Sequence, residues 1–138
     1  MITRSLGTAG PRVSAIGLGC MGMSDLYGPA DRAESIATIH AALDAGITLL
    51  DTGDYYGMGH NELLLQEALR GRAREKALIS VKFGALRDPK GGWIGMDARP
   101  AAMKNSAGSA CDQAVTISST AKMPHSSGSR LLTERVSL

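Results

Sequence analysis

The chain has 138 residues, of which 43% are hydrophobic and 20% charged, a composition typical of one globular domain with a moderate core. Its formal net charge of +2 offers no basic surface for a phosphate backbone, so we expect no nucleic acid among its partners. No stretch approaches the ~20 apolar residues of a membrane span, and residues 1–10 lack the apolar region of a secretion signal. We therefore expect a cytoplasmic protein that does not bind membranes. The spacing of Cys20 and Cys111 matches neither a metal-binding motif nor a disulfide pattern, so we predict two reduced thiols and no metal site.

The first elements along the chain are a hairpin and a strand. Residues 3–6 and 12–15 flank a turn-rich connection and could form a small hairpin. An apolar strand over residues 13–18 then runs into a glycine-rich loop, and Gly28 and Pro29 exclude a helix from that loop.

A first helix is predicted to begin after Asp31. Its carboxylate can cap the free N–H groups, Glu34 stands in the capping-box position, and Gly46 supplies the left-handed stop. Apolar spacing predicts a buried stripe formed by Ile36, Ile39, His40 and Leu43. We interpret His40 as a packed helix residue rather than a catalyst.

Two further strands and two further helices follow. Residues 47–50 and 77–82 predict buried strands, and between them a helix begins at Asn61 and ends before Gly71. Inward positions of that helix are Leu64, Leu65, Ala68 and Leu69. The order β, α, β, α, β with short connections predicts a parallel sheet with right-handed crossovers. A long loop then reaches Pro100, the predicted first residue of a third helix.

Charged side chains stand where these predicted strands end. Asp51 follows the strand at residues 47–50, and Lys82 ends the strand at residues 77–82. Because parallel strands end at the same edge of a sheet, where α/β enzymes place their chemistry, we expect an ion pair with Tyr56 nearby. This arrangement indicates a redox enzyme, although an ion pair that only ties strand ends together is the alternative.

Glycines at positions 17, 19 and 22 match the dinucleotide fingerprint of a Rossmann fold. In that fold the third glycine opens a helix, whereas here the predicted helix begins some nine residues later, and Asp51 lies too far downstream for the ribose-binding acid. A Rossmann-type domain therefore remains an alternative, and a tight strand-to-loop turn is compatible with either fold.

Three blocks in order carry a closer resemblance, at residues 16–23, residues 44–57 with Asn61 and Glu62, and residues 79–84. Through these blocks the sequence from Met1 to about Asn105 resembles the aldo-keto reductase family. The resemblance implies the N-terminal part of a (β/α)8 TIM barrel with a hairpin at its base, NADPH as hydride donor, and a small aldehyde or ketone as substrate.

The resemblance also assigns roles to individual residues. Tyr56 matches the family's proton donor, and Asp51 and Lys82 match its charged partners. A cationic lysine beside a tyrosine favours release of the phenol proton, and a carboxylate can hold the ammonium in place. Gly19, Cys20 and Met21, with Asp51, match positions that line the nicotinamide and substrate pocket. Trp93, on the long loop, could wall that pocket or could simply pack the loop.

The resemblance covers roughly three of the eight β/α units of a barrel, which typically needs about 250 residues. After about Asn105 the pattern changes: eight of the last 33 residues are Ser, and only residues 114–117 could form a strand. We therefore divide the chain into a partial barrel at residues 1–105 and a weakly structured tail at residues 106–138, the product of a truncated or frameshifted gene. The family's fourth catalytic residue, commonly a His after the fourth strand, has no match, since no convincing strand precedes His125.

An incomplete barrel leaves strand edges without partners, so we expect self-association. The alternative to an enzyme is a non-catalytic interaction or regulatory module that keeps the half-barrel as a binding surface.

Overall fold

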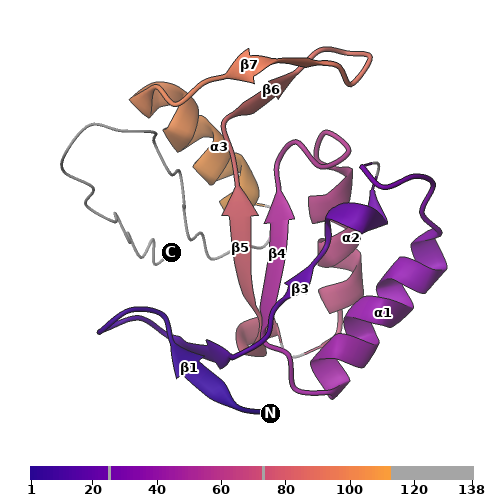
Figure 1. Cartoon of the computed structure of the whole chain (residues 1–138), viewed down its shortest axis with the longest axis vertical. Helices are drawn as coiled ribbons and strands as arrows, with labels where there is room; N and C mark the ends of the chain where they lie inside the picture. Colours follow the sequence, from indigo (N-terminus) through magenta and orange to yellow (C-terminus); the bar gives the residue numbers. More distant parts are fainter. Residues whose placement is uncertain (25, 73, 113–138) are drawn as a thin grey trace.

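Three parallel strands form the central sheet, in the order β3 (Leu18–Gly19), β4 (Leu49–Gly53) and β5 (Leu78–Lys82). The computed structural model describes residues 1–24, 26–72 and 74–112. Two helices connect the strands, α1 (Arg32–Asp44) between β3 and β4 and α2 (His60–Leu69) between β4 and β5. Both helices lie on the same side of the sheet (Figure 1). The predicted β, α, β, α, β order and its parallel pairing are therefore confirmed.

Two predicted strands have different bounds in the structure. The apolar segment at residues 13–18 is divided, because Val13 pairs with Arg4 in the N-terminal hairpin and only Leu18 and Gly19 join the sheet. Strand β4 begins two residues later than predicted and continues through Asp51 to Gly53, because the backbone of β5 still pairs with it there. Asp51 therefore lies inside β4 rather than beyond its end.

The helices begin and end largely as the sequence predicts. The Asp31 carboxylate accepts a hydrogen bond from the Glu34 backbone N–H at 2.8 Å, and Gly46 adopts a φ of 87° after α1. Helix α2 begins at His60, one residue earlier than predicted, after Gly59 with a φ of 92°. His40 packs as expected, with its Nε2–H donating to the Ala68 carbonyl at 2.8 Å.

The core lies between the sheet and the two helices. Its buried members are Cys20, Ile39, Leu50, Leu64, Leu65, Ala68, Leu69, Ala77, Ile79 and Val81. Alternation along β4 and β5 directs Leu50, Ile79 and Val81 toward the helices, so the intervening residues face the other side of the sheet. That second face carries Asp51 and Lys82 and is only half-buried.

Two antiparallel hairpins flank the sheet at opposite ends (Figure 1). The predicted N-terminal hairpin is formed by β1 (Thr3–Ser5) and β2 (Arg12–Ser14) and lies below the N-terminal ends of the strands. A second hairpin, β6 (Ala85–Arg87) with β7 (Trp93–Met96), occupies part of the segment predicted to be a long loop, so that prediction is wrong there. Short 3-10 turns at Met21–Met23 (η1) and Arg74–Lys76 (η2) complete the connections.

Helix α3 (Pro100–Asp112) begins at Pro100, as predicted. It continues past residue 105, so the predicted start of a weakly structured tail at residue 106 falls inside a helix. The possible strand at residues 114–117 and His125 lie outside the described residues.

Candidate active site

Asp51 and Lys82 form an ion pair on the half-buried face of the sheet. In the strand register Asp51 lies opposite Ser80 and Lys82 opposite Gly53, so the lysine is two residues farther along the strands. The Lys82 ammonium donates a hydrogen bond to Asp51 Oδ2, with about 39% of its side chain and 38% of that of Asp51 exposed. The predicted pair is therefore present and open to solvent.

Several contacts determine the protonation of Lys82. Burial alone would lower the pKa of its ammonium, but the hydrogen bond to Asp51 and a further one with the Tyr56 side chain raise the pKa above its ordinary value. Lys82 is therefore cationic at neutral pH and holds its positive charge beside the tyrosine.

Tyr56 folds back over the end of β4. Its backbone N–H donates to the Gly53 carbonyl at 2.9 Å, and Lys82 Nζ lies 5.5 Å from the centroid of its ring. Tyr55 contacts Tyr56 edge to face, with 4.9 Å between ring centroids. A Cβ at Gly53 would lie only 3.2 Å from Tyr56 Cε1, so a glycine is what gives the ring room. Tyr56 is 3% exposed, which shields its hydroxyl from bulk water and restricts access to it.

The loop after β3 lies against Asp51 through its backbone. The Cys20 N–H donates to the Asp51 carbonyl at 2.8 Å, while the Cys20 thiol is fully buried 3.7 Å from the Leu18 carbonyl oxygen. Burial, together with the negative charge of Asp51, raises the pKa of the thiol to about 12. Cys20 is thus unreactive as a nucleophile, whereas Gly19 is exposed, with nothing within 4 Å of where its Cβ would be.

A buried polar network that the sequence analysis did not predict holds this loop to β4. The Asn61 side chain is fully buried and donates to the Cys20 carbonyl at 2.8 Å and to Ser24 Oγ at 2.7 Å. It also accepts a hydrogen bond from Thr52 Oγ1 at 2.6 Å, and His60 Nδ1 lies 3.1 Å from Ser24 Oγ. The sequence signal was limited to Asn61 and Glu62 as part of the family resemblance, since the network joins residues up to 41 positions apart.

Trp93 lies at the start of β7 and is 63% exposed. Its register partner in the hairpin is Arg87, whose guanidinium donates to the Tyr55 carbonyl at 3.0 Å, and its role as a wall of the substrate pocket stays a prediction. In residues 1–24, 26–72 and 74–112 no three His, Cys, Asp or Glu side chains gather as metal ligands, and no helix is long and apolar enough to cross a bilayer.

Parallel β/α units that carry a lysine–carboxylate pair on the sheet are typical of α/β enzymes, and comparison with known proteins identifies the family. The model of the aldo/keto reductase family matches residues 15–115, so the chain belongs to that family. Over 80 residues it is 46% identical to "Probable aldo-keto reductase 1" of Glycine max, an alignment that covers 57% of this chain and 23% of the soybean protein.

Solved structures show the same relationship. Aldo-keto reductase AKR11C1 from Bacillus halodurans, in its holo form, is 31% identical, with a TM-score of 0.69 over 82% of this chain and 36% of that one. An aldo-keto reductase from Klebsiella pneumoniae in complex with NADPH is 26% identical, with a TM-score of 0.58 over 82% and 36% of the two chains. The chain thus spans less than half the length of these relatives and forms part of a (β/α)8 barrel. The Rossmann alternative is wrong.

Proposed function

We propose that the protein takes part in NADPH-dependent reduction of an aldehyde or ketone to an alcohol. The observation that supports this most directly is the Asp51–Lys82 ion pair, whose ammonium lies over the ring of Tyr56 on the half-exposed face of the sheet. Family membership supports an oxidoreductase, and these three side chains supply the acid–base part of such a reaction.

The chemical role of each of the three residues follows from its contacts. Reduction of a carbonyl leaves negative charge on the substrate oxygen, which must receive a proton. Tyr56 is the donor, because it is the phenol that lies beside the Lys82 ammonium. Lys82 provides the cation, and Asp51 holds the ammonium in place through their hydrogen bond.

The surroundings of the ion pair fit the nicotinamide end of NADPH. Gly19 is exposed at the end of β3, opposite Asp51 in the strand register, and nothing lies within 4 Å of where its Cβ would be. Cys20 and Met21 follow it directly in the chain. In this proposal Gly19, Met21, Asp51 and the backbone of Cys20 hold the cofactor. When bound, NADPH supplies the hydride.

The test is carbonyl-dependent loss of NADPH absorbance by the 138-residue chain, assayed with a panel of small aldehydes and ketones. Tyr56→Phe should lower the rate by a factor of about 10² or more, as expected when a general acid is removed. Tyr55→Phe is the matched control, because it removes the neighbouring hydroxyl and should retain most of the rate. Equal loss in both variants would refute the assignment of Tyr56.

The interaction module is the second candidate, favoured by the free edges of the sheet. In the described part of the chain β3 and β5 each pair with β4 alone, so each presents one unpaired edge. Sedimentation velocity should then show concentration-dependent self-association. Absence of turnover together with a defined hetero-oligomer would favour the module over the enzyme.

A further inference from the structure

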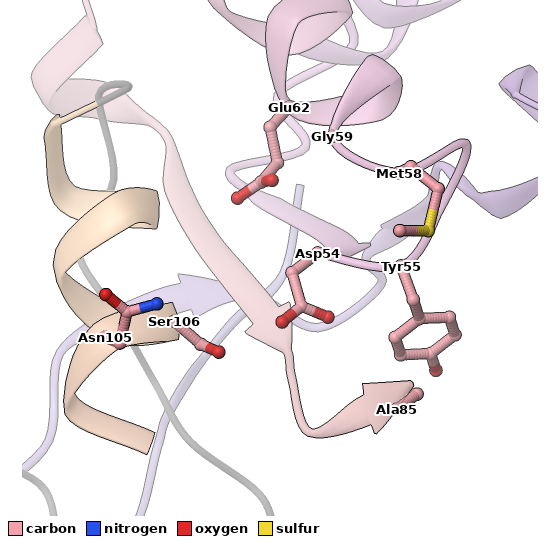
Figure 2. A pocket seen from close by; sticks show the side chains of 8 residues that line it. All are labelled: Asp54, Tyr55, Met58, Gly59, Glu62, Ala85, Asn105 and Ser106. Carbon is pink, nitrogen blue, oxygen red and sulfur yellow. The ribbon is translucent and has the colours of Figure 1, made fainter. Parts of the chain in front are cut away.

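A cavity with an acidic lining lies between the beginning of α2 and the middle of α3, and neither Asp51 nor Lys82 lines it. It has a volume of about 260 Å³. Figure 2 shows the side chains of Asp54 and Glu62 directed into it from one side, with Asn105 and Ser106 of α3 across from them. The remaining lining residues are Tyr55, Met58, Gly59 and Ala85.

The two carboxylates have unused hydrogen-bonding capacity. Glu62 is only 7% exposed, yet its Oε1 has no hydrogen-bond partner among the described residues, and the same holds for Asp54 Oδ1. A buried acceptor without a donor is costly, typically by about 1–3 kcal/mol and by more when it is charged. In native structures such an atom marks a strained or catalytic group, or a site where a water or an ion binds.

Ionisation of the two carboxyl groups is costly in this cavity. Burial raises the pKa of Glu62, and the neighbouring Asp54 raises it further. Burial also raises the pKa of Asp54, although hydrogen bonds with Ser106 and with the backbone of Gly84 and Tyr55 partly oppose this. A cation in the cavity would relieve both effects.

The shape and chemistry of the lining distinguish among cations. Among the described residues no third His, Cys, Asp or Glu joins the two carboxylates, and two such ligands are fewer than a typical protein metal site uses. The Tyr55 ring, the Met58 thioether and the Ala85 methyl add aromatic and apolar walls. A flat organic cation with several N–H donors can bond separated carboxylate oxygens and stack on such walls.

We infer that the cavity between α2 and α3 binds a guanidinium group, with Glu62 Oε1 and Asp54 Oδ1 as its acceptors. The group can belong to a small molecule or to an arginine side chain of another polypeptide. The site is independent of carbonyl reduction, since it uses neither Lys82 nor Tyr56.

The experiment is an NMR titration of the ¹⁵N-labelled 138-residue chain with methylguanidinium chloride at neutral pH, with sodium chloride at matched ionic strength as the blank. Saturable shifts should appear at Tyr55, Gly59, Glu62 and Ala85. Glu62→Gln should weaken binding about tenfold or more, the factor expected when a hydrogen bond to a charged group is lost. Asp54→Asn should act in the same direction, and Glu34→Gln, which changes an exposed acid on α1, should have no effect.

Two further titrations identify the source of the group. Tighter binding of a short arginine-containing peptide than of free arginine would indicate a polypeptide partner, and the reverse order a small molecule. Tighter binding of Mg²⁺ or Ca²⁺ at the same residues would overturn the inference in favour of a metal site. Shifts that do not saturate, binding unchanged in Glu62→Gln, or a spectrum without the dispersion of a folded chain would also overturn it.

Discussion

Replacing Asn61 by Ala removes the centre of the buried polar network and offers a quantitative test of the structure. Three side-chain hydrogen bonds disappear, those with Thr52 Oγ1, the Cys20 carbonyl and Ser24 Oγ. At roughly 0.5–1.5 kcal/mol each the loss is about 3 kcal/mol, of which the better helix propensity of alanine returns about 0.5 kcal/mol. We therefore expect the free energy of unfolding to fall by about 2–3 kcal/mol.

Urea unfolding followed by far-ultraviolet circular dichroism measures this loss. Thr52→Val removes the hydroxyl that donates to Asn61, so the double variant should lose less than the sum of the single losses, by at least about 0.5 kcal/mol. Asn105→Ala changes the chain's other asparagine, which is exposed, and should alter stability by less than about 0.5 kcal/mol. A loss below about 1 kcal/mol for Asn61→Ala, with additive single effects, would refute the network.

Three further variants test other parts of the structure. In Gly53→Ala the new Cβ would lie 3.2 Å from the ring of Tyr56 and 3.3 Å from that of Tyr55. The near-ultraviolet circular dichroism should therefore change, and the free energy of unfolding should fall by about 1 kcal/mol. An unchanged tyrosine spectrum would contradict the placement of the rings. Because burial raises the pKa of Glu62 in the folded state, the stability linked to its protonation is present below the ordinary pKa of a glutamate and is lost as pH rises through the raised value. Thermal melts of the ligand-free chain should therefore show that Glu62→Gln raises the melting temperature relative to wild type more at pH 7 than at pH 4. An equal change at both pH values would argue against a buried carboxyl. Asp31→Ala should cost about 1 kcal/mol in urea unfolding through loss of the N-cap of α1, whereas Asp31→Asn should retain most of the stability.

The sequence was sufficient for features that depend on neighbours along the chain. The cap at Asp31, the stop at Gly46 and the inward stripe of α2 follow from local hydrogen bonds and helical spacing, and the structure contains all of them. The Asp51–Lys82 pair was also predictable, because parallel strands bring their C-terminal halves to one edge regardless of the connecting helix.

Features that depend on tertiary pairing were missed. Strand β4 extends past its apolar residues since the backbone of β5 continues beside it, and hydropathy carries no signal of that pairing. The β6–β7 hairpin was not predicted from the sequence. Its apolar side chains Trp93, Ile94 and Met96 are all exposed, so the segment lacks the alternation of buried and exposed residues that indicates a strand. Likewise, nothing local shows that Glu62, in the first turn of α2, meets Asp54 in a shared cavity.

The register between the parallel strands β4 and β5 limits where residues can be inserted into this protein or removed from it. Asp51, Gly53, Ser80 and Lys82 share one face only because successive residues of a strand alternate sides and the two strands keep a single register. Inserting one residue within β4 just before Asp51 would turn its carboxylate into the hydrophobic core and break the contact with Lys82. Insertions in the connections outside the strands shift no residue along the ladder. Length variation is therefore best placed in the loops, and the strands are best changed in steps of two residues.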